Sequence, residues 1–217
     1  MMLVKDYMTK NLITADKSLK IFDAVELMKQ HDIHRLPVVE NKRLVGLITE
    51  GTIQEAMPSK ATSLSVYEAN YLLNKTVVED VMIKEVETIK ETCLLEDAIF
   101  QMRKHKVNVL PVLNKMNDVV GIITNNDIFD AFLNITGYRE PGTRVSISIS
   151  HDEEGVLAKL TQIFKDNHLN IIQIVVYRHE EQPVIVIQTT SEENEVIKDV
   201  LEKEGYNVLS SIQTVNR

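Results

Sequence analysis

The sequence predicts a mixed α/β protein in which a duplicated unit is followed by a separate, smaller domain of α+β type. The first observation is an internal repeat, because Val4 to Ile53 can be laid over Val78 to Ile128 with one residue inserted near Met116. The second is the order of patterns after Thr143, which reads strand, helix, strand, strand, helix, strand. Together they predict two packed copies of one unit and a further domain.

The two copies agree at positions spread along their whole length, which chance similarity does not produce. The identical pairs are Val4/Val78, Asp6/Asp80, Met8/Met82, Thr14/Thr88, Asp23/Asp97, Ala24/Ala98, Met28/Met102, His31/His105, Leu36/Leu110, Pro37/Pro111, Val38/Val112, Gly46/Gly121, Ile48/Ile123, Thr49/Thr124 and Ile53/Ile128. Neither copy has enough apolar surface to stand alone. We therefore expect them to pack through their sheets as one pseudo-twofold domain.

Each copy is expected to contain a short strand, a helix, two strands and a closing helix. In the first copy the apolar residues of the helix recur at helical spacing, with Ser18 placed to cap it: Leu19, Phe22, Ala24, Val25 and Met28. Two short apolar runs that begin at Leu36 and Leu44 are joined by a polar turn, as in a strand pair. The closing helices are expected to begin at Thr49 and Thr124.

The last domain begins after a cluster of turn residues, Gly137-Tyr-Arg-Glu-Pro-Gly. Its expected elements are a strand from Arg144, a helix through Val156 to Phe164, strands Leu169–Arg178 and Pro183–Thr190, a helix over 192–204 ended by Gly205, and a strand Asn207–Thr214. This βαββαβ order is that of the ferredoxin-like fold. The expected divisions are 1–57 and 78–136 for the copies, 58–77 for a linker with a short helix at Val66 to Leu73, 137–143 for a second linker, and 144–217 for the last domain.

Composition excludes several classes of function. The net charge of -8 and the lack of a long Lys/Arg run argue against a nucleic-acid or membrane surface. No apolar run approaches the roughly 20 residues that cross a bilayer. The single cysteine, Cys93, forms no internal disulfide, and the first residues do not resemble a secretory signal, so we expect a cytoplasmic location.

The copies differ at polar residues beside their strands. His34-Arg35 precedes the strand of the first copy where the second has Asn108-Val109, and Thr124-x-x-Asp127 ends the second where the first has Thr49-x-x-Thr52. Arginine and histidine suit an anionic ligand, although for an isolated pair two solvated residues before a strand are the better explanation. Thr124 and Asp127 have the spacing of a helix capping box, and the same two side chains could also bind a ligand. The two roles are compatible, because a helix N-terminus favours anions.

These motifs resemble known families. Val4 to about Leu133 resembles a tandem pair of cystathionine-β-synthase (CBS) domains, through His34-Arg-Leu-Pro-Val and Gly121-Ile-Ile-Thr-Asn-Asn-Asp127. The remainder resembles an ACT domain, through Asp152-Glu-Glu-Gly155-Val-Leu157 and Asn170-Ile171. The order CBS, CBS, ACT is similar to that of the acetoin-utilisation accessory proteins of bacteria.

The resemblance implies a regulatory protein that binds an adenosine derivative in the CBS pair. The implied ligand is AMP, ADP or ATP, with S-adenosylmethionine, cyclic di-AMP and NAD as further candidates. The implied nucleotide-binding residues are Thr124 and Asp127 for ribose and phosphate, His34 and Arg35 for phosphate, and Thr14, Ala15, Thr88, Ile89, Val107, Leu110 and Gly121 around the base. For the apolar members, core packing is the competing explanation. Thr52 replaces the aspartate in the first copy, so we expect one dominant site.

The ACT resemblance implies self-association and a small-ligand site at Asp152, Gly155 and Asn170, with helix entry as the competing role for the first two. We expect a homodimer and a protein target that the sequence does not identify. His31 and His105 lack partners for a metal, and Cys93 lacks a base, so the sequence predicts no cofactor, no metal and no enzyme activity. The alternative is an interaction scaffold that has lost its ligands.

Overall fold

The computed structural model describes residues 2–56, 75–151, 153–179 and 182–215. The chain divides into two compact units, Met1–Ile128 and Phe129–Arg217. The linker helix expected over Val66 to Leu73, and Asp152, lie outside the described residues. Within the described residues, no helix is long and apolar enough to cross a membrane.

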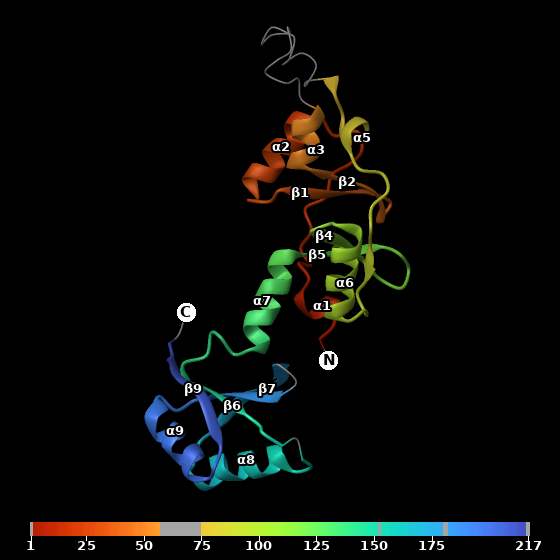
Figure 1. Ribbon diagram of the computed structural model, residues 1–217. Helices are drawn as coiled ribbons and strands as arrows, with labels where there is room; N and C mark the ends of the chain where they lie inside the picture. Colours follow the sequence, from red (N-terminus) through yellow and green to blue (C-terminus); the bar gives the residue numbers. More distant parts are fainter. Residues whose placement is uncertain (1, 57–74, 152, 180–181, 216–217) are drawn as a thin grey trace. The chain divides into compact units, whose positions relative to one another are not determined.

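The first copy consists of α1 (Val4–Tyr7), α2 (Ile21–Gln30), β1 (Arg35–Glu40), β2 (Arg43–Thr49) and α3 (Glu50–Ala56). β1 and β2 form an antiparallel pair, and α2 and α3 lie on the same side of it (Figure 1). The short first strand is reduced to a single parallel bridge between Ala15 and Val38. The core contains Ala24 and Met28 of α2, so the helical spacing places these apolar residues correctly.

Two details of the first helix were predicted wrongly. Ser18 does not cap α2, whose N-cap is Lys20 without a side-chain bond. The Ser18 backbone N–H and hydroxyl both donate to Asp16, at 2.8 and 2.6 Å, because a short polar side chain can close a turn before the helix begins. Phe22, expected in the apolar stripe, is 62% exposed.

The second copy contains α5 (Val78–Val81), β3 (Ile89–Lys90), α6 (Leu95–His105), β4 (Val109–Leu113), β5 (Val119–Thr124) and α7 (Asn125–Ile135). β3 pairs with β4 in parallel and β4 with β5 in antiparallel fashion. Both copies carry a bulge at the same place, after Val38 and after Val112. The expected order is thus present in both copies, with the first strand short in each.

The copies exchange their first segments. The N–H groups of Val4 and Leu95 bond to Cys93 and Met2, and Thr9 bridges Ile122, so the start of the first copy packs on the second. In the opposite direction, Val78 belongs to the core of the first copy, and Leu47 and Ile83 exchange two backbone hydrogen bonds of 2.9 Å. The first segment of each copy therefore packs into the fold of the other copy.

The second unit contains the predicted βαββαβ order: β6 (Gly142–Ser148), α8 (Val156–Asp166), β7 (Ile171–His179), β8 (Gln182–Thr189), α9 (Asn194–Lys203) and β9 (Asn207–Thr214). The four strands form one sheet in the order β7-β8-β6-β9. The helices α8 and α9 cover one face, with Leu160, Phe164, Ile197 and Leu201 in the core (Figure 1). Gly205 ends the last helix with φ +84°.

Candidate functional site

The first unit contains a cavity of about 590 Å³, which we call the main cavity. Its walls come from β2 of the first copy, from the segment 83–87 and from α6 to β4 of the second copy. Six apolar side chains line it: Leu47, Ile83, Val86, Met102, Val107 and Val109. The polar and charged lining residues are Thr49, Glu85, Glu87, Arg103, Lys106, Asn108 and Asn125. A cavity of this size that combines an apolar wall with polar groups is typical of a small-molecule site.

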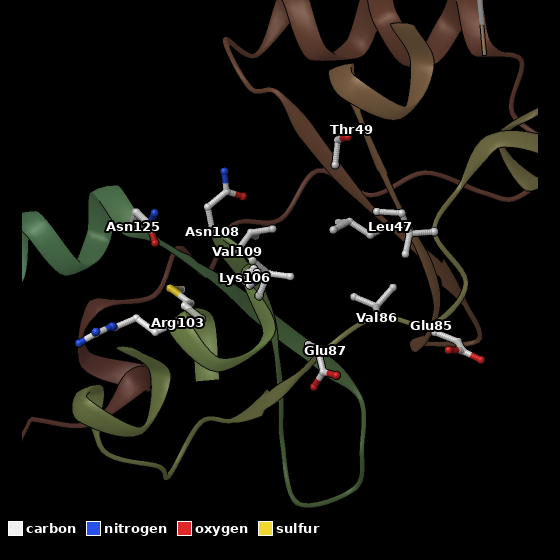
Figure 2. A pocket seen from close by; sticks show the side chains of 13 residues that line it. Leu47, Thr49, Glu85, Val86, Glu87, Arg103, Lys106, Asn108, Val109 and Asn125 are labelled. Atoms are coloured by element: carbon white, nitrogen blue, oxygen red, sulfur yellow. The ribbon is translucent and has the colours of Figure 1, made fainter. Parts of the chain in front are cut away.

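The exchange of segments builds this cavity. The paired hydrogen bonds between Leu47 and Ile83 fix the chain that continues to Val86. Figure 2 shows the side chains of Leu47 and Val86 pointing toward one another across the cavity. Arg103 extends away from it, and Glu85 and Glu87 lie at its edge. Leu47 and Val86 therefore give the cavity an apolar wall, and Lys106 also lines it.

A second, polar cavity of about 480 Å³ adjoins the main cavity. It is lined by His34, Arg35, Thr49, Glu50, Gly51 and Asn108, and it shares Thr49 and Asn108 with the main cavity. His34 and Asn108 occupy equivalent positions in the two copies. The polar cavity is therefore lined by the residues that precede the equivalent strands β1 and β4 of the two copies.

The charges of the polar cavity favour an anion at one point. His34 Nδ1 lies 3.1 Å from Glu50 Oε2, and both side chains are more than half exposed. Arg35 is half-buried and, within the described part of the chain, forms no ion pair. A guanidinium without a carboxylate partner suits a phosphate, which accepts its hydrogen bonds in fork geometry.

Thr124 and Asp127 form the capping box that their spacing predicts. The Thr124 N–H and hydroxyl donate to Asp127 Oδ2 at 2.6 and 2.8 Å, and the Asp127 N–H donates to the Thr124 hydroxyl at 3.4 Å. Both residues are half-buried, and Asn125 between them lines the main cavity. Asp127 Oδ1 takes no part in the box. The box thus leaves one carboxylate oxygen for another donor.

The first copy closes the same turn with hydroxyl groups. The Thr49 N–H donates to Thr52 Oγ1 at 3.0 Å, the Thr52 N–H donates to Thr49 Oγ1 at 3.1 Å, and Thr52 Oγ1 donates to the Thr49 carbonyl at 2.9 Å. The cap needs only an acceptor, so threonine replaces aspartate without loss of the turn. What the first copy lacks is the charged acceptor.

The other residues proposed around the base lie in different environments. Val107 lines the main cavity, whereas Ile89 and Leu110 are buried in the core and Thr88 is half-buried outside the cavity wall. In the first copy, Ala15 is buried and pairs with Val38, while Thr14 is exposed.

Gly121 does not line the main cavity, because the space beside its Cα is filled by Met8. The proposal that this glycine admits a ligand is replaced by a packing role. A strand glycine accommodates a neighbouring side chain as readily as a ligand, and the sequence does not distinguish them.

Several wall residues were not anticipated: Leu47, Ile83, Val86, Met102, Asn108 and Val109. Asn108 was detectable, because the repeat places it opposite His34. Leu47 and Val86 were not, because they meet only through the exchange of segments. Among the described residues, no group of three or more His, Cys, Asp or Glu side chains is arranged to hold a metal ion.

The second unit has a smaller cavity of about 210 Å³ at the start of α8. Gly155, the N-cap of α8 with φ +89°, lines it together with Ile149, Val176, Pro183 and Ile185. Asn170 is exposed, directly precedes β7 and does not line this cavity. The structure therefore does not bring Asn170 to Gly155.

Family models match most of the chain. Residues 4–59 and 78–134 match the CBS domain, and residues 143–206 match the ACT domain. The chain belongs to the CBS-domain family. It carries a CBS pair followed by an ACT domain, as the motifs predicted.

Curated relatives share the CBS pair. An L-aspartate semialdehyde sulfurtransferase of Methanocaldococcus jannaschii is 32% identical over 131 residues, which are 60% of this chain and 23% of that enzyme. The CBS domain-containing protein YhcV of Bacillus subtilis is 33% identical over 125 residues, 58% of this chain and 81% of that protein. The chain spans about a quarter of the length of the enzymes that it matches first.

Solved structures of CBS pairs are similar as well. An acetoin utilization protein (AcuB) from Vibrio cholerae is 30% identical, with a TM-score of 0.53, over 63% of this chain and 94% of that one. The CBS pair of protein MJ0100 in complex with 5′-methylthioadenosine and S-adenosyl-L-methionine is 30% identical, with a TM-score of 0.51, over 62% and 98%. CBSX2 in complex with AMP is 25% identical, with a TM-score of 0.53, over 62% and 99%.

Proposed function

We propose that this chain is a non-catalytic regulatory protein whose CBS pair binds an adenosine-containing ligand in the main cavity. The observation that carries the proposal is that a cavity of about 590 Å³ with an apolar wall adjoins a polar cavity that is lined by Arg35. A nucleotide has the same division, with an apolar base at one end and phosphates at the other. AMP in CBSX2 and S-adenosyl-L-methionine in the MJ0100 pair support an adenosine ligand.

In this proposal the base lies between Leu47 and Val86, and Thr49 and Asn108 line the passage to the phosphates. Asp127 Oδ1 accepts a hydrogen bond from a ribose hydroxyl, because Oδ2 already closes the capping box. Arg35 binds a phosphate. These assignments favour AMP, ADP or ATP over S-adenosylmethionine, whose sulfonium carries a positive charge toward Arg35.

The ACT domain is proposed to mediate a homodimer and to sense a small metabolite at the cavity beside Gly155. The likeness to the Vibrio cholerae protein supports a role in acetoin utilisation, through a protein target. Light scattering tests the dimer, since a clean monomer at micromolar concentration contradicts it.

An interaction scaffold without ligand is the second candidate function. The feature that favours it is Thr52, which closes the turn of the first copy without a charged acceptor. Under this reading the capping box of Thr124 and Asp127 is structural only, and no adenosine ligand stabilises the protein.

Titration calorimetry decides between the two. We expect AMP, ADP or ATP to bind wild-type protein more tightly than adenosine, 5′-methylthioadenosine, S-adenosylmethionine, cyclic di-AMP or NAD. Val86→Asp is expected to abolish binding by placing a carboxylate in the apolar wall, whereas Val196→Asp, at a half-exposed valine of α9, is the matched control. No heat and no thermal stabilisation with any of these ligands would establish the scaffold.

A further inference from the structure

In the second unit, the segment 134–140, which we call the connector, lies on the face of the sheet opposite to α8 and α9. Val145 of β6 packs in the core under these helices, so the side chain of its neighbour Arg144 lies on the other face. From that face Arg144 Nη2 donates to the Thr136 carbonyl at 2.7 Å, and Thr214 Oγ1 of β9 donates to a carbonyl at the end of the connector at 2.9 Å. The connector is therefore hydrogen-bonded to the second face of the sheet.

A cavity of about 180 Å³, which we call the connector cavity, lies between the connector and β9. One residue of the connector, one of β6 and the end of the last strand line it: Tyr138, Arg144, Ile212, Gln213, Thr214 and Val215. It shares no residue with the cavity beside Gly155. Because drug-sized ligands occupy about 300 to 1,000 Å³, the connector cavity has room only for a small molecule.

Arg144 brings a positive charge to the connector cavity without a carboxylate to balance it. The guanidinium is half-buried, and its two hydrogen bonds go to neutral acceptors, from Nη2 to the Thr136 carbonyl and from Nε to Gln188 Oε1 at 3.2 Å. Within the described residues, Arg144 forms no ion pair and its Nη1 makes no hydrogen bond. A guanidinium that two bonds already orient presents Nη1 to an anion, and charge-assisted bonds of this kind are strong.

The remaining lining residues decide which anion fits. Ile212 and Val215 are 58% and 57% exposed, so a ligand that covers them gains from the removal of apolar surface from water. Arg144 is the one charged side chain among the described residues that line the cavity. An ammonium group would therefore have no carboxylate to pair with, and a second acidic group would have no second cation. These features favour an anion with a single negative charge and an apolar tail.

We propose that the connector cavity binds a short-chain monocarboxylate. Arg144 binds the carboxylate through Nη1, and Ile212 and Val215 contact the hydrocarbon tail. The site goes beyond the proposed function, because it uses neither cavity of the CBS pair nor the cavity beside Gly155. It also selects against amino acids, since their ammonium group finds no counter-charge there.

An NMR titration of the full chain with three matched probes tests the site. Isovalerate has the charge and the tail, isovaleramide has the same shape without the charge, and L-valine is isovalerate with an added ammonium group. We expect isovalerate to bind at least about tenfold more tightly than either, since charge-assisted hydrogen bonds are roughly twice as strong as neutral ones. The amide signals that shift are expected to include those of Tyr138, Arg144 and Gln213.

A charge placed in the cavity provides the second test. Ile212 pairs with Arg144 across β9 and β6 and is exposed, so Ile212→Glu adds a carboxylate beside the guanidinium at a position that tolerates a polar side chain. It is expected to weaken isovalerate binding at least about tenfold, because the new carboxylate competes for Arg144. Leu209→Glu is the matched control. Leu209 lies on the same strand, is 55% exposed and does not line the cavity, so the affinity is expected to stay within about threefold of wild type.

Four outcomes overturn the site. They are the absence of any shift with isovalerate, equal affinity for isovalerate and isovaleramide, equal effects of Ile212→Glu and Leu209→Glu, and shifts confined to the residues around Gly155. The last outcome places the ligand in the other cavity of this unit. The comparison of probes on wild-type protein decides even where Ile212→Glu fails to fold.

Discussion

The sulfur atom of Met8 occupies the space that a Cβ on Gly121 would fill. The pseudo-twofold repeats the contact, because Met82 lies in the same way against Gly46. In both cases the methionine comes from one copy and the glycine from the other. Gly121, which the sequence offered as a ligand-site residue, and its equivalent Gly46 are therefore contacts that join the copies.

Gly121→Ala is expected to destabilise the protein by about 1 to 3 kcal/mol, the usual cost of overpacking a close contact. The added Cβ also reaches the backbone carbonyl of Thr9 at 3.1 Å, which cannot move aside as a side chain can. Chemical denaturation measures the loss. Gly51→Ala in α3 is the control, because its Cβ meets nothing closer than 3.5 Å and alanine favours a helix by up to about 1 kcal/mol. Equal effects of the two substitutions would contradict the packing role.

Val4→Ala is expected to lower the free energy of unfolding by about 2 kcal/mol, since Val4 is fully buried and each lost methyl contributes about 0.8 kcal/mol before any cavity cost. Val196→Ala, at a half-exposed valine, is the control.

Because the first segment packs on the second copy, a fragment of residues 75–136 is expected to lack cooperative unfolding. Fusion of residues 1–10 through a flexible linker is expected to restore structure, and a stable fragment without them would disprove the exchange.

Asp127→Ala is expected to weaken nucleotide binding by roughly 10- to 150-fold, the equivalent of about 1.5 to 3 kcal/mol for a charge-assisted hydrogen bond. It should also cost about 0.5 to 2 kcal/mol of stability, because the capping box is lost. Asp127→Asn keeps an acceptor for the cap and removes the charge, so it separates the two effects. Calorimetry on these variants and on Thr52→Asp, which is expected to strengthen the first site, measures both. Unchanged affinity in Asp127→Ala leaves the cap as the sole role.

Ser18→Ala is expected to raise the pKa of Asp16 toward 3.8. The hydroxyl and N–H of Ser18 donate to the Asp16 carboxylate and lower its pKa in the folded protein, and the substitution removes the hydroxyl bond. A lowered pKa stabilises the fold above the unfolded pKa, and this contribution is lost as the pH falls through the folded value. A carboxyl titration followed by NMR checks the direction. A pKa of Asp16 that does not rise would contradict the assignment.

The sequence predicted the order of elements in both units because periodicity is local. The alternation that begins at Arg144 and the helical spacing that includes Ala24 and Met28 need no information from elsewhere in the chain. The prediction from sequence failed where two local signals compete. Ser18 resembles a helix cap, yet Asp16 lies two residues before it and takes both of its hydrogen bonds.

The candidate site was also only partly predictable from the sequence. Its polar residues were visible in the sequence as differences between the copies, because His34 and Arg35 align with Asn108 and Val109 of the second copy. Most of its apolar wall was not visible in the sequence, because a valine of the core and a valine that lines a cavity look the same in the sequence. Only the structure places Leu110 in the core and Val107 in the cavity wall.

By itself the sequence determined the duplication, the βαββαβ order of the last domain and the capping box of Thr124 and Asp127. Only the tertiary structure decided that Leu47 and Val86 line one cavity, and that Met8 fills the space at Gly121. The physical reason is the range of the interactions. Helix periodicity and caps act over a few residues, whereas the cavity and the exchanged segments join residues that are tens of positions apart and meet only when the chain is packed.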